Sequence, residues 1–373
     1  MAVLTVLALI LITAISEKIL SYRHRHDHQG IQRYIRLREY KPYFSEALLP
    51  PEVELKIADN LERKPYRLRI DGNGFIIPSR IHEQPDLSLV FLGGSSTACG
   101  YMAEEQRFPY LVGRILENAT GKKINSYNSG VGGNNSLHSL DILFNKIIPL
   151  KPEIVLLCHN INDLTTLLLE GTYWSANPSR SCLVSVQPSI RGSLKEIQDL
   201  LIPNLSREVS RLSRRFKEKV RSSGKQADSE DEFARVRDRK IQVDAGRLRQ
   251  SFQSNLQLFI EICRLHQIRP VLLTQPSRLT EIPDPIIMAS LRDLERRQGL
   301  PYQEYKKLFD AFNDEIREVG QKNGIMVIDL AAHIPPEKEY LYDVVHFTAS
   351  GSQRAAELIA AAIKAGFPDL VKY

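Results

Sequence analysis

Residues 88–97 read SLVFLGGSST, and this stretch decides the fold that we expect. Its apolar part is long enough for one buried strand, and it ends in two glycines followed by hydroxyl side chains. Four more apolar runs of strand length follow along the chain, and all five are bounded by turn-forming residues. The predicted strands cover residues 88–93, 124–128, 153–158, 270–274 and 325–330.

Helical periodicity fills the space between these runs. Continuous apolar strands that alternate with helices indicate a parallel sheet covered on both faces, with right-handed crossovers. We therefore predict an α/β fold, a three-layer α/β/α sandwich with a doubly wound five-stranded parallel sheet. Before the first strand, YRLRIDGNGFIIP at residues 66–78 is typical of a hairpin. The predicted helices cover residues 108–118, 137–150, 251–266, 302–323 and 350–365.

Composition excludes several classes of protein. The chain has 373 residues, of which 43% are hydrophobic and 25% charged, so neither wholesale disorder nor a polytopic membrane protein is expected. Its four cysteines lack CxxC or Cys/His spacing, so no metal site is expected. No cofactor is expected either. Most of the net charge of +6 comes from residues 207–240, with 12 basic and 7 acidic residues.

Residues 2–15 read AVLTVLALILITAI, without a charge. A membrane-spanning helix needs about 20 apolar residues, a length reached at Tyr22 if Glu17 and Lys18 lie at the interface. We favour an uncleaved anchor at residues 1–22; a cleaved signal peptide and a buried core helix are the alternatives. Basic residues only after the apolar run favour a cytoplasmic main domain. A secretory signal normally carries positive charge before its apolar run, and this chain has no Lys or Arg there. On which side of the membrane the main domain lies stays open.

The remaining chain divides into a membrane-proximal connector at residues 23–65 and a main domain at 66–373. Residues 170–250 are too many for an ordinary crossover and predict a basic helical insertion. We interpret its segment 207–240 as a solvated charged face, with contact to anionic lipid headgroups as the alternative. No nucleic acid is expected as a partner, because few aromatic side chains there could stack on bases.

Polar blocks follow the predicted strands, at the edge of a doubly wound sheet where ligands bind. Each block alone has two interpretations. The block after the first strand contains either a nucleophilic serine or a phosphate-binding loop that lacks the usual lysine. The block after the second strand either supplies backbone N–H donors or is a flexible turn. The third offers a side-chain amide or a helix cap. In the last, a carboxylate three residues before an imidazole either fixes a general base or forms a surface pair. The blocks are GGSST (93–97), NSGVGGNNS (128–136), HNIND (159–163) and DVVHFTASG (343–351).

Together the four blocks resemble those of the SGNH (GDSL-type) hydrolase family, in the same order. The resemblance spans Leu87 to Phe367, apart from the insertion, and implies the flavodoxin-like SGNH hydrolase fold. It implies Ser95 as nucleophile, His346 as base and Asp343 as its orienting partner. It also implies an oxyanion hole made by the Ser95 and Gly133 backbones and the Asn162 amide.

Two positions depart from the family pattern. Gly94 stands where the family usually has Asp, as in a GGS variant, and Asn160 stands where it has Gly, which predicts a crowded site or altered access. Three other histidines, His138, His159 and His333, are interpreted as supporting or structural, because none has an acidic partner at the DxxH spacing.

The sequence thus predicts a membrane-anchored esterase that cleaves an O-acyl ester of a lipid or a surface polysaccharide. One alternative is an O-acyltransferase that uses the same site and passes the acyl group to a sugar hydroxyl. Another is a non-catalytic module that binds glycans or lipids on the same fold.

Overall fold

The computed structural model describes residues 2–23, 33–175, 177, 180–185, 236 and 238–371. The chain divides into two compact units, Met1–Arg36 with Leu183–Glu232, and Leu37–Cys182 with Phe233–Tyr373. Most of the predicted insertion at 170–250 and nearly all of the basic segment 207–240 lie outside the described residues.

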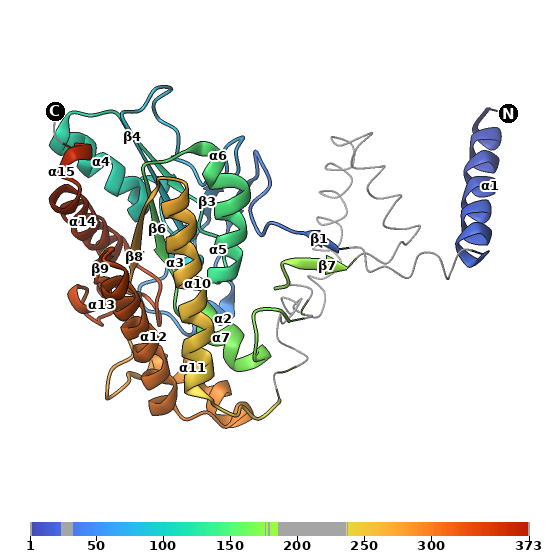
Figure 1. The fold of residues 1–373 in the computed structure, drawn as a ribbon. Helices are drawn as coiled ribbons and strands as arrows, with labels where there is room; N and C mark the ends of the chain where they lie inside the picture. The colour runs from blue at the N-terminus through green and yellow to red at the C-terminus, as the bar shows by residue number, and fades with distance from the viewer. Residues whose placement is uncertain are drawn as a thin grey trace. The chain divides into compact units, whose positions relative to one another are not determined.

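The second unit is built on the five-stranded parallel sheet that the sequence predicts (Figure 1). Along the sheet the order is β5-β4-β6-β8-β9, so the first strand of the five lies between the second and the third. The direction of winding therefore reverses between β4 and β6. The strands are β4 (Leu87–Gly93), β5 (Ile124–Asn128), β6 (Ile154–Cys158), β8 (Arg269–Leu273) and β9 (Met326–Ile328).

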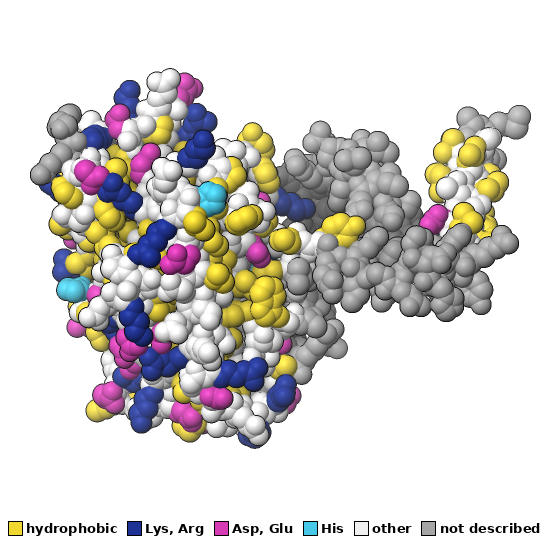
Figure 2. Space-filling view, viewed as in Figure 1, with side chains coloured by type: hydrophobic (Ala, Val, Ile, Leu, Met, Phe, Trp, Pro, Cys, Tyr) yellow, Lys and Arg dark blue, Asp and Glu magenta, His cyan; other side chains and the backbone are white. Residues whose placement is uncertain are grey.

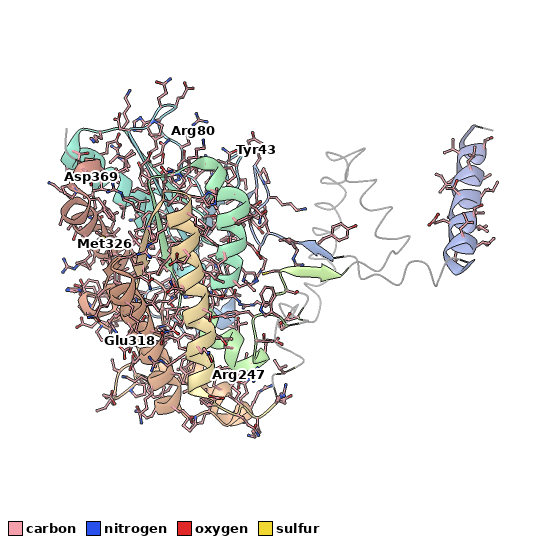
Figure 3. The ribbon with its side chains drawn as sticks, in the orientation of Figure 1. Tyr43, Arg80, Arg247, Glu318, Met326 and Asp369 are labelled. Atoms are coloured by element: carbon pink, nitrogen blue, oxygen red, sulfur yellow. The ribbon has the colours of Figure 1, made fainter. Side chains whose placement is uncertain are left out.

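Helices cover both faces of this sheet (Figure 1). Alternate residues of β4 enter different cores: Phe91 packs with α4 and α14, and Val90 with the helices of the opposite face. At the end strand, Met326 packs on the α14 side (Figure 3). One face holds α4 (Phe108–Thr120) and α14 (Ala349–Gly366), and the other α5 (Ser136–Ile142), α7 (Ile161–Glu170), α10 (Ala245–Leu265) and α12 (Tyr302–Asn323).

Shorter elements complete this unit. The predicted helix at 137–150 is interrupted, because α5 passes through a π-helical turn, Leu143–Ile147, into α6. Helix α11 was not predicted. The other elements are β2 (Ser45–Leu48), α2 (Glu52–Leu55), β3 (Tyr66–Arg69), α3 (Ser95–Ala98), the 3-10 turn Glu104–Gln106, α6 (Ile148–Leu150), α11 (Pro285–Gln298), α13 (Leu330–His333) and α15 (Pro368–Val371).

The predicted hairpin at 66–78 forms only in part. Asp71 and Phe75 close a turn, and Ile70 makes one antiparallel bridge with Ile76. The strand partner of β3, however, is β2, paired antiparallel along its whole length. Because β2 comes from the segment predicted as a connector, that segment contributes structure to the main unit.

The same segment also contacts the loop that carries the last polar block. The Asp59 backbone N–H donates to the Tyr342 carbonyl at 2.6 Å, and its carboxylate pairs with the buried Arg278 at 2.8 Å. Residues well before the first strand of the sheet therefore help to hold the loop at 342–346.

The first unit contains α1 (Ala2–Arg23) and a two-stranded antiparallel pair, β1 (Arg33–Ile35) with β7 (Leu183–Ser185). Apolar side chains cover α1 and are exposed (Figure 2). In the part of the chain that is described, no helix combines the length and the hydropathy that crossing a membrane requires. The predicted transmembrane helix thus finds no support in the structure.

Candidate active site

The polar blocks meet at the carboxyl end of the sheet, where the winding direction reverses. Ser95 begins α3 directly after β4, and Asn162 lies in the first turn of α7, directly after β6. The two strands are neighbours, with Gly93 paired to Cys158 at their ends. Doubly wound sheets bind ligands at this point. The topology therefore places the first and third blocks side by side.

Ser95, His346 and Asp343 form a continuous series of hydrogen bonds. His346 Nε2 lies 2.8 Å from Ser95 Oγ, and His346 Nδ1 lies 2.7 Å from Asp343 Oδ2. The other oxygen of Asp343 accepts the backbone N–H groups of Val345 and His346 at 3.0 and 2.8 Å. The carboxylate is thus fixed by the turn itself. With Nδ1–H donating to it, Nε2 is left to accept the serine proton.

The electrostatics of this pair favour a basic imidazole beside a charged carboxylate. Burial disfavours the charged form of His346, but the Asp343 carboxylate outweighs burial and raises the pKa of His346. Burial likewise opposes ionisation of Asp343, yet His346 and two backbone N–H groups hold the pKa of Asp343 below its ordinary value. A histidine with this environment is a stronger proton acceptor than an isolated one.

Aromatic and acidic groups outside the predicted blocks surround His346. The Tyr342 ring stacks on the imidazole, with 5.5 Å between centroids and 10° between planes. Tyr101 hydrogen-bonds Glu54 of α2, whose negative charge also favours protonated His346. Sequence reasoning missed these residues, and only the position of Tyr342 directly before the last block could have pointed to one of them.

The glycine-rich loop presents Gly133 in a left-handed conformation, with φ of +74°. Its carbonyl accepts hydrogen bonds from the guanidinium groups of Arg38, at 3.2 Å, and Arg180. Among the residues that the structure describes, no group accepts a hydrogen bond from the backbone N–H of Gly133 or of Ser95. Both N–H groups are therefore available to a ligand oxygen.

The Asn162 amide packs directly over the turn that carries Ser95. Its Nδ2 donates to the Asn134 carbonyl at 2.8 Å, which uses one of the two amide hydrogens. A Cβ added to Gly94 would lie only 2.3 Å from the same nitrogen. The first departure from the family pattern therefore makes room for the Asn162 amide.

The second departure, Asn160, does not crowd the serine. Its side chain is buried, and its amide donates to the Phe309 carbonyl of α12 at 2.9 Å. The alternative effect, altered substrate access, stays a prediction. Asn160 instead ties the start of α7 to the neighbouring helix.

Gln275 follows β8 and connects the first and third polar blocks through its side chain. The sequence patterns did not predict this role. The Gln275 side chain accepts the Ile161 N–H at 2.9 Å and donates to Ser96 Oγ at 2.9 Å. Asn313 of α12 holds its backbone through two hydrogen bonds, of 3.0 and 2.9 Å. Gln275 therefore links the residues next to Ser95 and Asn162, from a strand end that no motif marks.

The other histidines occupy supporting positions. Burial lowers the pKa of His138 and of His159 to about 3, so both are neutral. His159 contacts Ser139 at 2.7 Å and Asp163 at 3.6 Å, but all three side chains are buried away from solvent. His333 is exposed and contacts the Asp329 carbonyl through Nδ1 at 2.7 Å.

Cys99 lies beside this arrangement, because its Sγ donates to the Ser96 carbonyl at 3.2 Å and it lines a small cavity with Ser95 and His346. All four cysteines are buried and none forms a disulfide, and burial raises the pKa of Cys99, Cys158 and Cys263 to about 12. Over the described ranges, no three His, Cys, Asp or Glu side chains are grouped so that they could hold a metal ion.

Two larger cavities and one small cavity adjoin the site. One of about 700 Å³, which we call the polar cavity for its charged side chains, is lined by Lys64, Arg67 and Glu104 and also by apolar and aromatic side chains such as Leu61 and Phe347. A much smaller cavity lined by Ser95 and His346 shares Tyr101, Met102, Tyr342 and Phe347 with it. A second cavity, of about 300 Å³, is mainly apolar and is lined by His346 itself.

Comparison with known proteins was made at three levels. Residues 91–354 match the model of the GDSL-like Lipase/Acylhydrolase family. No curated protein matches the chain. Solved structures with a similar fold include a GDSL-like lipase from Bacteroides thetaiotaomicron (14% identity, TM-score 0.40, covering 75% of this chain and 89% of the other). Others are an acetylxylan esterase from Geobacillus stearothermophilus (13%, 0.42, 74% and 94%) and a lipase/acylhydrolase from Enterococcus faecalis (17%, 0.42, 75% and 96%).

The family model covers well over half of the chain and contains all four polar blocks. The chain belongs to the GDSL-like lipase/acylhydrolase family.

Proposed function

We propose that the protein is a serine hydrolase that cleaves an O-acyl ester, with Ser95 as nucleophile, His346 as general base and Asp343 as its orienting partner. The observation that carries the proposal is the hydrogen-bonded series from Ser95 Oγ through His346 to Asp343. Hydroxyl, imidazole and carboxylate in this order are what activating a serine requires. The raised pKa of His346 adds support.

In the first step, Ser95 Oγ attacks the ester carbonyl carbon while His346 Nε2 takes the hydroxyl proton. The carbonyl oxygen becomes an oxyanion, which the N–H groups of Ser95 and Gly133 and the Asn162 amide stabilise. When the tetrahedral intermediate collapses, the bond to the alcohol oxygen breaks and His346 returns its proton to the leaving alcohol. The acyl group is now an ester of Ser95.

In the second step, His346 takes a proton from water, and the hydroxyl group attacks the acyl-enzyme. As the second intermediate collapses, the bond between the acyl carbon and Ser95 Oγ breaks, His346 returns its proton to Oγ, and the carboxylic acid is released. No cofactor enters either step. Asp343 stays ionised throughout and stabilises the imidazolium, in keeping with the lowered pKa of its carboxyl.

We propose a lipid or a surface polysaccharide as the source of the ester. The polar cavity of about 700 Å³ supports an alcohol that carries hydroxyl or charged groups, because acidic and basic side chains both line it. Through the small cavity beside Ser95, it adjoins the position that a leaving alcohol would take.

The proposal is tested by labelling with a fluorophosphonate probe. Wild type should be labelled, and Ser95→Ala should not be, because only an activated serine reacts quickly with this probe. Ser350→Ala is the matched control, since Ser350 is an exposed serine that lines the neighbouring polar cavity. Folded wild type without labelling would refute the proposal, as would equal labelling of Ser95→Ala. In turnover assays, free acid identifies a hydrolase and an acylated sugar acceptor identifies a transferase.

A further inference from the structure

The apolar cavity of about 300 Å³ lies between α7, α11, the start of α12 and the loop that carries His346. One wall is a single face of α7, because its lining residues there are spaced three and four apart. The facing wall comes from α11, the helix that the sequence patterns did not reveal. The side chains that matter most are Ile161, Thr165, Leu168, Leu291 and Leu294.

Of the proposed catalytic groups, His346 and Asp343 line this cavity, and Ser95 lies across the imidazole from Asp343. His346 lines it directly, and Ile161 on its α7 wall is the residue before Asn162. One end is therefore bounded by the proposed base and by the neighbour of a proposed oxyanion donor. His346 also lines the small cavity that contains Ser95, so an acyl chain on Ser95 would reach the space between α7 and α11 by passing the imidazole.

The polar side chains in the lining are already paired. Ser290 Oγ donates to the Ile286 carbonyl at 2.9 Å, and Tyr305 hydrogen-bonds Thr165. Asp343 is held by His346, as described above. A hydroxyl-rich ligand would thus find few partners here, whereas burying a polar group without a partner is costly. The lining selects for an apolar ligand.

We propose that this cavity binds the acyl chain of the ester, and that it fits an unbranched chain of medium length. The inference rests on the proposed function and adds the acyl class. A water-sized group takes about 30 Å³, and a methylene is of similar size, so a cavity of this volume holds at most about ten. The apolar cavity receives the acyl group, and the polar cavity beyond Tyr101 and Tyr342 receives the alcohol.

The first test compares p-nitrophenyl esters that share one leaving group and differ only in the acyl chain. Each buried methylene is worth roughly fourfold in binding, so kcat/KM should rise at least tenfold from acetate to octanoate. Hexadecanoate should bring no further gain, because its carbons exceed the cavity. A wild type that hydrolyses acetate as well as octanoate would overturn the inference while leaving the hydrolase proposal intact.

The second test narrows the cavity. Leu291→Trp should lower the ratio of octanoate to acetate kcat/KM at least tenfold, and Leu294→Phe should lower it in the same direction. Arg292→Trp is the matched control, because Arg292 is the next residue of α11 and is exposed. Circular dichroism checks that each variant folds. An unchanged ratio in both folded cavity variants would contradict the inference.

The third test needs no turnover. In the Ser95→Ala protein, calorimetric titration should detect octanoate binding and no acetate binding, and adding Leu291→Trp should weaken octanoate binding at least tenfold. If Ser95→Ala binds octanoate but the fluorophosphonate probe does not label folded wild type, the acyl-chain cavity is supported and the hydrolase proposal is refuted. Absence of octanoate binding would refute the cavity whatever the activity.

Discussion

Replacing Gly94 by alanine should disable the site through Asn162 without harming the backbone. Gly94 has φ of −90° and ψ of −150°, an extended conformation that alanine tolerates. The new Cβ, however, would lie 2.3 Å from Asn162 Nδ2, and the amide must move by about 1 Å to reach ordinary van der Waals contact. The Asn134 carbonyl, 3.2 Å from the same Cβ, leaves the amide little room to retreat on that side.

The expected cost follows from the role of the amide. A displacement of about 1 Å in a catalytic group can cost about 100-fold in rate, and losing one oxyanion donor costs about 100- to 1,000-fold. We therefore expect kcat of Gly94→Ala to fall about 100-fold with KM little changed, since the donor acts mainly in the transition state. Asn162→Ala should fold normally and lose at least as much. The assay is steady-state hydrolysis of the best p-nitrophenyl ester.

A double-mutant cycle isolates the cause. In an Asn162→Ala background the clash disappears, so adding Gly94→Ala should cost less than about threefold. Gly132→Ala is the matched glycine control, because a Cβ there meets nothing within 4 Å. Losses that multiply in the double variant, or a Gly94→Ala enzyme within threefold of wild type, would refute the reasoning.

Three further predictions address the base and the buried supports. Asp343→Asn should lower kcat about 1,000- to 10,000-fold. Because the carboxylate raises the pKa of His346, removing its charge should move the acid limb of kcat/KM against pH to lower pH. An unmoved limb would contradict this cause. Gln275→Leu should lower the free energy of unfolding in urea by about 1–3 kcal/mol by leaving buried polar partners unpaired, and an unchanged value would show that the network contributes no stability. Burial raises the pKa of Asp163 to about 6, so the folded state holds a proton that the unfolded state has released, and stability should fall as pH rises from about 4 to 6. Asp163→Asn should flatten urea-derived stability over this range, and an equally steep dependence would mean that another group is responsible.

Much of the fold could be read from local pattern. The five apolar runs became β4, β5, β6, β8 and β9 with ends shifted by only one or two residues. This works because strands buried on both faces are mostly apolar. The exception is β5 (INSYN), whose buried Asn125, Ser126 and Asn128 side chains all form hydrogen bonds. The π-helical turn after α5 and the pairing of β2 with β3 were missed, since neither leaves a periodic signal.

The site divides in the same way. The order of the polar blocks placed Ser95 and Asn162 just after neighbouring strands, and a parallel sheet must collect its carboxyl ends at one edge. His346 lies further from its strand, in the loop between α13 and α14. The contacts that form at this edge could not be predicted from the sequence. The closeness of Asn162 to Gly94, the bridging role of Gln275 and the stacking of Tyr342 all depend on distances between segments far apart in the chain.

The sequence by itself determined the class of fold, the positions of the strands along the chain and the residues that we propose for the chemistry. Each of these follows from hydrophobic periodicity or from short motifs, which are local properties. Only the tertiary structure decided the shape of the site, with an apolar cavity between α7 and α11 and a polar one beyond Tyr342. A cavity is the space that packed helices leave unfilled, and that space depends on how side chains from distant segments meet.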